Sequence, residues 1–125
     1  MQLDPPESTG PWHVVTAEVT RAIAAVYRDQ LGRGPNRARS YFAGHDVLVC
    51  ILSGTTTPAE RYLIQQGQSH RVRETRLVLQ SAARHALCDA VERAGARRVV
   101  ASTSGLDPDA DVATEVFVLS PETGS

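Results

Sequence analysis

Apolar residues near the start of the chain recur with the period of an α-helix. Spacings of four, four, three and one place them in a stripe on one helix face, formed by Val15, Val19, Ile23, Val26 and Tyr27. Thr16 suits the N-cap, and Glu18 lies in the first turn, where the helix dipole favours an anion. Gly32 and Gly34 can adopt the left-handed conformation that ends a helix, and Pro35 prevents its continuation. The pattern predicts a helix over about 16–32.

Two short strand-like runs follow, at 37–43 and 46–52. The glycine at position 44 permits a tight reversal between them, so we expect an antiparallel hairpin. The second run is apolar almost throughout, which predicts a central strand covered on at least one face. Arg37 and Arg39 share one face of the first strand because side chains alternate with a period of two.

A capping box then marks the start of a helix. Thr57 and Glu60 have the required spacing, and Pro58 occupies the first helical position. We expect a short helix to about Gln66, before Gly67 loosens the chain.

A longer helix is predicted over 69–94, capped by Ser69 and ended by Gly95. Its apolar positions fall on one side, which we expect to face the core: Val72, Leu79, Ala83, Ala86, Leu87, Ala90, Val91 and Ala94.

The last two strands are predicted at 98–102 and 114–119, joined by a loop rich in Ser, Gly and Asp. The order of elements is then αββαββ. An α+β fold follows, in which a four-stranded antiparallel sheet of two hairpins is covered by two main helices. We expect a flexible lead-in at 1–14, a single domain at 15–120 and a tail at 121–125.

The composition is that of one globular domain of 125 residues. The longest apolar run, 47–52, is far shorter than the roughly 20 residues of a membrane span. Residues 1–11 are acidic and Pro-rich, unlike a signal peptide, so we expect no membrane insertion and a cytoplasmic location. Cys50 and Cys88 are expected to be small buried hydrophobes.

Charge is distributed unevenly along the chain. All 13 basic residues are arginines between positions 21 and 98, whereas acids dominate both ends. A basic middle suits an anionic partner, but acids interrupt it, so a solvated helix face whose arginines pair with the acidic loop is the favoured explanation. Nucleic acid is disfavoured as a partner because few aromatic residues are present for base stacking.

No residues form a recognisable catalytic or metal-binding motif. Asp107, Asp109 and Asp111 alternate as in a calcium loop, but the glycine and glutamate that an EF-hand needs are absent. His85, Cys88 and Asp89 would be neighbours on a helix, yet nothing supplies a fourth ligand. The sequence therefore predicts no catalytic residue, no metal and no cofactor.

The segment Ser102–Gly105 combines hydroxyl groups with a flexible backbone and could form a small anion nest. Together with the acidic turn it gives four secondary candidates for a site: Ser102, Ser104, Asp107 and Asp109. Polar residues at a strand end explain the same pattern without a function.

The strongest candidate surface comprises Arg33, Arg37 and Arg39. Guanidinium groups that converge near a helix end can bind a carboxylate, a phosphate or an acidic protein surface. Alternatively, the two glycines and Pro35 only stop the helix, and the arginines are solvated.

These residues also carry a family resemblance. Over about residues 17–120 the chain resembles the MpsC-like family of bacterial proteins, through Gly32-Arg33-Gly34-Pro35, Arg37-Ala38-Arg39, Tyr41, Leu52, Thr57-Pro58-Ala59-Glu60-Arg61, Asp107-Pro108-Asp109 and Glu115-Val116-Phe117-Val118-Leu119. The family is named after a component of a sodium-translocating, membrane-potential-generating system linked to inorganic-carbon uptake, and many members are domains of unknown function. No established catalytic residues come with it.

The resemblance implies a non-catalytic accessory or regulatory domain that acts by binding a protein at the membrane or a small anion. The sequence leaves undecided whether the chain forms homo-oligomers. The alternatives are a small cytoplasmic enzyme with its site at the 102–111 loop, and a nucleic-acid binder that uses the arginines between 71 and 84.

Overall fold

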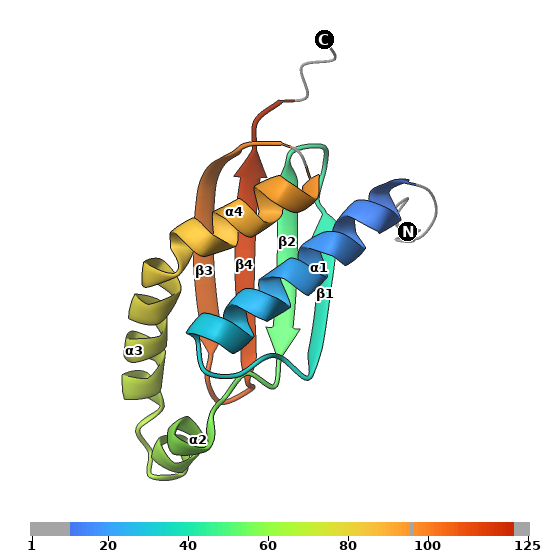
Figure 1. The fold of residues 1–125 in the computed structure, drawn as a ribbon. Coiled ribbons are helices and arrows are strands. Elements are labelled where there is room, and N and C mark those ends of the chain that lie inside the picture. Colours follow the sequence, from blue (N-terminus) through green and yellow to red (C-terminus); the bar gives the residue numbers. More distant parts are fainter. Residues whose placement is uncertain (1–10, 96, 122–125) are drawn as a thin grey trace, which may run out of the picture.

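The computed structural model describes residues 11–95 and 97–121. Two helices, α1 (Pro11–Gln30) and α4 (Arg84–Gly95), lie over one face of a four-stranded antiparallel sheet (Figure 1). The shorter helices α2 (Pro58–Gln65) and α3 (Ser69–Ala82) lead from the sheet to α4, and α3 lies beside β3. The fold is therefore α+β with an antiparallel sheet, as predicted.

The sheet has the strand order β1-β2-β4-β3. The predicted hairpins are both present, one formed by β1 (Arg37–Phe42) and β2 (Val47–Ser53), the other by β3 (Val99–Asp107) and β4 (Val112–Leu119). They are joined through antiparallel pairing of β2 with β4. The last strand of the chain thus lies at the centre, beside the strand that was predicted to be central.

The third strand is longer than predicted. It continues through Ser102–Gly105 to Asp107, so the predicted loop shrinks to a short turn before β4. Small polar residues have weak β-propensity, and pairing with β4 overrides it. The interpretation of 102–111 as one continuous loop is therefore wrong.

The first helix begins at Pro11, earlier than the predicted start at Thr16. Proline has no N–H and a fixed φ, and it is favoured in the first turn of a helix, where that N–H is not needed. The predicted lead-in therefore overlaps α1 at 11–14, and its first ten residues lie outside the described part. The predicted tail lies outside it from 122 onward.

Gly32 ends the helix region with a φ of +91°, as expected of a left-handed cap, whereas Gly34 is not among the glycines with positive φ.

The predicted helix over 69–94 is broken into α3 and α4 at Ala83. No glycine or proline marks the break, so the sequence offers no local signal for it. Ala83 is buried, and the break lets α3 lie beside β3 while α4 packs against α1 (Figure 1). Leu79, which was predicted to face the core, is instead exposed, and Arg76 and Gln80 are buried.

The core lies between the two helices and the sheet. It contains Val19, Ile23, Tyr27, Leu31, Leu48, Cys50, Leu52, Val72, Ala83, Leu87, Val91, Leu106, Ala113, Phe117 and Leu119. Residues of even number on β2 and of odd number on β4 face the helices, which is the alternation of a pleated sheet. Cys50 is fully buried, as predicted, and burial raises the pKa of its thiol to about 11.

Candidate functional site

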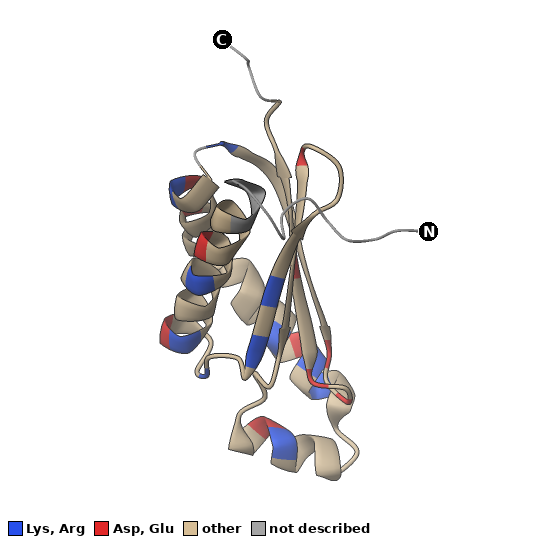
Figure 2. Cartoon of the chain, turned by 90° about the vertical axis from the view of Figure 1, so that its right-hand side faces the viewer, with Lys and Arg blue, Asp and Glu red and all other residues tan. Residues whose placement is uncertain are grey.

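The predicted arginines lie on and before the edge strand β1. Arg37 and Arg39 are exposed, and the strand register places them on the sheet face turned away from α1 and α4. The basic positions of β1 are coloured blue in Figure 2. The Arg39 guanidinium stacks over the Tyr41 ring, 5.9 Å from its centroid. Arg33 is half-buried in the loop that precedes β1. Among the described residues, none of the three arginines forms an ion pair.

The sheet face that bears Arg37 and Arg39 has an apolar centre. The outward residues of the two central strands are almost all β-branched and half-buried: Val47, Val49, Ile51, Val112, Thr114, Val116 and Val118. Within residues 11–95 and 97–121, no helix lies on this side, whereas α1 and α4 cover the other (Figure 2). We call this surface the open face.

The open face departs from the usual pattern of an antiparallel sheet. Where one face meets water, strands normally alternate between apolar residues inside and polar residues outside. Here β2 is apolar on both sides, and β4 nearly so. A contiguous apolar area of this kind on a folded protein is typical of an interaction surface.

The secondary candidates do not form one site. Ser102 and Ser104 lie on the helix side of β3, whereas Asp107 lies on the open face and Asp109 in the turn that follows. The carboxylates of Asp107 and Asp109 each accept a hydrogen bond within the chain. Asp107 accepts from the backbone of Ala110, and Asp109 accepts from Ser69.

The third aspartate of the turn, Asp111, ties the turn to the chain after β2. One of its carboxylate oxygens accepts hydrogen bonds from the backbone N–H groups of Thr55 and Thr56, at 3.0 and 3.1 Å. Asp111 also has a φ of +56°, the left-handed conformation that aspartate tolerates better than most residues. The carboxylates of Asp109 and Asp111 therefore hold the turn against α3 and the chain after β2.

A buried carboxyl group that the sequence analysis missed lies behind Ser104. Glu115 accepts hydrogen bonds from the Ser104 hydroxyl at 2.5 Å, the Tyr27 hydroxyl at 2.6 Å and the Gln80 amide at 3.1 Å. Burial raises the pKa of Glu115 despite these three donors. Burial also raises the pKa of Tyr27, and the neighbouring Glu115 carboxylate adds to the effect. The sequence did contain a signal for this burial, because the alternation of β4 places Glu115 on the helix side, between the inward residues Ala113 and Phe117.

A polar cavity of about 270 Å³ adjoins this cluster. It is lined by Leu77, Gln80, Ser81, Arg84, Ser102 and Ser104. Ser104 is exposed, and its hydroxyl is held by the buried Glu115 carboxyl group. The side-chain oxygen of Gln80 is buried and has no hydrogen-bond partner among the described residues. A serine beside a carboxylate of raised pKa has the two groups that nucleophilic catalysis requires.

A second buried polar cluster joins α3 to the start of α2. Arg76 is 1% exposed and donates to both carboxylate oxygens of Glu60, at 3.0 and 2.6 Å. It also donates to the hydroxyl and the carbonyl oxygen of Thr55. Burial favours a higher pKa for Glu60, but hydrogen bonds from Arg76 and Thr57 and the Arg76 charge outweigh it, so the pKa is lowered. Glu60 also completes the predicted capping box with Thr57. The cluster is satisfied within the chain, which indicates a structural role.

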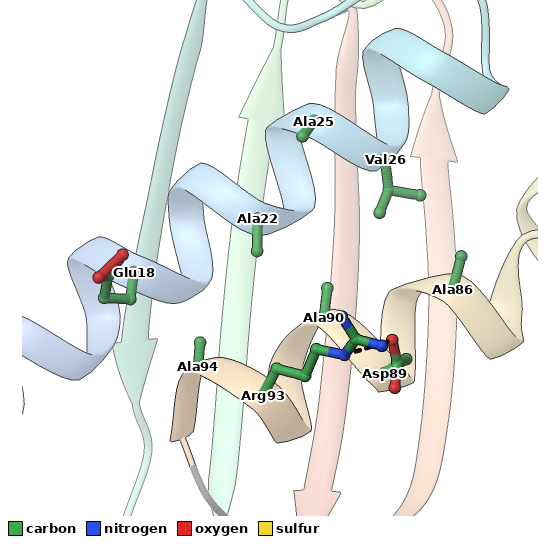
Figure 3. A pocket seen from close by; sticks show the side chains of 9 residues that line it. All are labelled: Glu18, Ala22, Ala25, Val26, Ala86, Asp89, Ala90, Arg93 and Ala94. Atoms are coloured by element: carbon green, nitrogen blue, oxygen red, sulfur yellow. Dashed lines mark ion pairs between the residues drawn. The ribbon is translucent and has the colours of Figure 1, made fainter.

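The outer surface between α1 and α4 forms a groove of about 540 Å³ (Figure 3). Alanines line most of it, with Ala22 and Ala25 on α1 facing Ala86, Ala90 and Ala94 on α4. The charges at its rim are paired within the chain, because Arg93 contacts Asp89 at 3.0 Å and Arg21 contacts Glu18 at 2.7 Å. We assign no ligand to this groove.

The thiols and histidines gather into no metal site within the described residues. Cys88 is half-buried and contacts the Ser102 hydroxyl at 3.7 Å. In the same part of the chain, no helix combines the length and hydrophobicity that a bilayer-spanning segment needs.

In a comparison with protein families, a family model matches residues 13–121. The chain belongs to the MpsC family. This family is described as the Na⁺-translocating membrane potential-generating system (MpsC). No curated protein and no solved structure matches the chain. The family membership links the chain to a membrane-potential system, and the predicted resemblance is confirmed.

Proposed function

We propose that this MpsC-family chain is a non-catalytic accessory component of the Na⁺-translocating system, and that it acts by binding another protein through the open face. The observation that carries the proposal is the apolar centre of the sheet, which no described helix covers and which Arg37 and Arg39 flank. Aliphatic side chains supply the area that drives association, and the arginines supply orientation.

Two sets of charged residues differ in whether the chain itself pairs them, and this difference supports the choice of the open face. Arg76 is buried and Glu60 half-buried, and both are saturated by contacts within the chain. Arg37 and Arg39, in contrast, are exposed and form no ion pair with any described residue. Exposed guanidinium groups remain available to an acidic surface or a small anion. The proposal places the chain in the cytoplasm, where its free thiols, Cys50 and Cys88, stay reduced.

The experiment is capture of native partners by tagged full-length chain. We expect Arg39→Glu to weaken capture of components of the Na⁺-translocating system by roughly 10-fold to 100-fold, as for a lost charged hydrogen bond. Arg71→Glu on α3 is the matched control, because Arg71 is equally exposed and forms no ion pair in the described structure. Equal capture by Arg39→Glu and wild type would exclude the open face as the binding surface.

A small enzyme is the second candidate, and the contact between Ser104 and Glu115 beside the polar cavity favours it. An activated serine reacts with a fluorophosphonate probe. If the site is catalytic, the wild type is labelled at Ser104 and Glu115→Gln is labelled more slowly. Ser102→Ala is the matched control, since Ser102 lines the same cavity without contacting Glu115. Absence of labelling at Ser104 removes this candidate.

A further inference from the structure

The open face has opposite charges at its two edges. The strand register aligns one residue from each strand across the sheet, in the row Arg37, Ser53, Val112 and Asp107. Arg37 is therefore at the β1 edge and Asp107 at the β3 edge of the same row. Three strand spacings separate them, or roughly 14 Å, so they cannot pair with each other.

Neither charge has an ionic partner within the described residues. Arg37 is exposed, and Asp107 is exposed and accepts only the backbone N–H of Ala110. Ser53 and Val112 lie between them in this row, and the apolar residues of β2 and β4 continue from it along the strands. The surface is thus a hydrophobic strip with a cation on one side and an anion on the other.

We infer that a second copy of this chain covers the open face, related to the first by a two-fold axis. This axis lies midway between the two sheets, runs parallel to the strands and passes over the boundary between β2 and β4. This inference rests on the proposed function of the open face as a protein-binding surface, and it names the occupant. A two-fold interface uses one patch on both subunits, so the patch must be complementary to itself.

A rotation of 180° about this axis leaves each row at the same position along the strands and exchanges the two edges of the sheet. The β1 edge of one copy then faces the β3 edge of the other, and β2 faces β4. Arg37 of each copy faces Asp107 of its partner, which gives two equivalent ion pairs. Sheets packed face to face are about 10 Å apart, a gap that an arginine and an aspartate can bridge.

The other face-to-face two-fold axis, which runs across the strands, is disfavoured by charge. It would place β1 of one copy over β1 of the other, and Arg37 and Arg39 of both copies would gather along one edge. Like charges across an interface oppose association. The charge pattern therefore selects the axis parallel to the strands.

The test is sedimentation analysis of purified full-length chain and two single charge reversals. We expect a dimer for the wild type. Arg37→Asp places like charges at both contacts of its own dimer, and so does Asp107→Arg. Each variant alone should dimerise on the order of 100-fold more weakly. Mixed in equal amounts, they should form a heterodimer of nearly wild-type affinity, because both contacts then join opposite charges.

Two further variants control for the position of the interface and for net charge. Val116→Glu in the apolar centre should give a folded monomer, with folding checked by circular dichroism. Arg71→Asp changes the net charge as Arg37→Asp does but lies on α3, and it should leave the dimer intact.

A monomeric wild type, or a dimer that survives Val116→Glu, overturns the inference. Failure of the two charge reversals to complement each other overturns the two-fold arrangement.

The outcomes that contradict the proposed function are different from these. If the purified chain is monomeric but partner capture still depends on Arg39, only the second copy is excluded. If the dimer forms but capture does not depend on Arg39, the open face joins two copies of the chain, and binding of another component through it is excluded.

Discussion

The two faces of the sheet have nearly the same apolar content but different surroundings. On the helix side, Leu48, Cys50 and Leu52 of β2 are buried under α1 and α4. On the open face, Val49 and Ile51 of the same strand are only half-buried, because within residues 11–95 and 97–121 only neighbours on the sheet cover them. The comparison teaches that β2 is apolar on both faces, whereas the described part of the chain buries only one of them.

The polar groups on the two faces of the sheet differ in a similar way, because those on the helix side have partners within the chain. On the helix side, Glu115 is held by Tyr27, Gln80 and Ser104. On the open face, Arg37 and Asp107 have no ionic partner in the described structure. Saturated polar groups serve the fold, whereas unsaturated charges remain available for recognition.

The largest expected effect concerns Arg76, whose guanidinium is fully paired within the chain, and it tests whether this pairing stabilises the fold. Arg76→Ala removes the buried guanidinium that donates to Glu60 and Thr55, and removal of one partner of a buried ion pair costs up to about 3–5 kcal/mol. Arg71→Ala on the same helix is exposed and should change stability by less than about 0.5 kcal/mol. Urea unfolding measures both. Equal stability of the two variants would show that the Arg76 cluster contributes nothing to the fold.

The next prediction compares the faces directly, through two adjacent residues of β2. Leu52→Ala removes a fully buried side chain from the core and should cost about 2–5 kcal/mol. Ile51→Ala changes the open face and should cost about 1 kcal/mol when the chain is dilute. Repeating the unfolding at high chain concentration sharpens the contrast, since Ile51 then also contributes to the dimer. A larger cost for Ile51 than for Leu52 in dilute solution would reverse the assignment of the faces.

Much of the fold could be predicted because its signals are local. The capping box at Thr57 and the apolar runs of β2 and β4 depend on neighbouring residues alone. The break at Ala83 has no such signal, because it arises from packing against the sheet and α1. β3 was predicted too short for the same reason, since pairing with β4 orders its small polar residues.

Parts of the candidate surface were also predictable. The period of two was enough to place Arg37 and Arg39 on one face. That Asp107 lies in the row of Arg37 depends on the pairing of β2 with β4, which is far from local in sequence. Burial of Arg76 and Gln80 was missed because polar residues are normally expected outside.

A smaller effect of pH distinguishes the carboxyl groups of Glu115, which is buried, and Glu60, which is half-buried. The pKa of Glu115 is raised in the folded state, so its stabilising contribution is present below the ordinary Glu pKa of about 4.3 and is lost as pH rises through the raised value. The stability of wild type relative to Glu115→Gln should therefore fall with rising pH.

Glu60 should behave in the opposite way, because its pKa is lowered by Arg76 and Thr57. Its contribution is present above the ordinary pKa and is lost as pH falls through the lowered value. The stability of wild type relative to Glu60→Gln should rise with pH. Unfolding measured from pH 3 to pH 8 in steps of about one unit checks both, and parallel slopes would contradict the assigned environments.

The smallest effect concerns the predicted arginine that lies outside the sheet. Arg33→Ala should change stability by less than about 0.5 kcal/mol, because the guanidinium forms no ion pair with the described residues. Gly32→Val, next to it, forces a β-branched residue to a φ of +91° and should cost at least about 1 kcal/mol. Thermal unfolding compares the two. A large loss for Arg33→Ala would make this arginine structural.

The central position of β4 also determines the order in which the molecule can be built during synthesis. Each hairpin can form from neighbouring sequence, but β2 keeps one edge unpaired until residues 112–119 have left the ribosome. That edge belongs to the most apolar strand of the protein, and exposed edges of this kind favour aggregation. A nascent chain stalled before Val112 would therefore be a stronger target for chaperones than one stalled after Leu119.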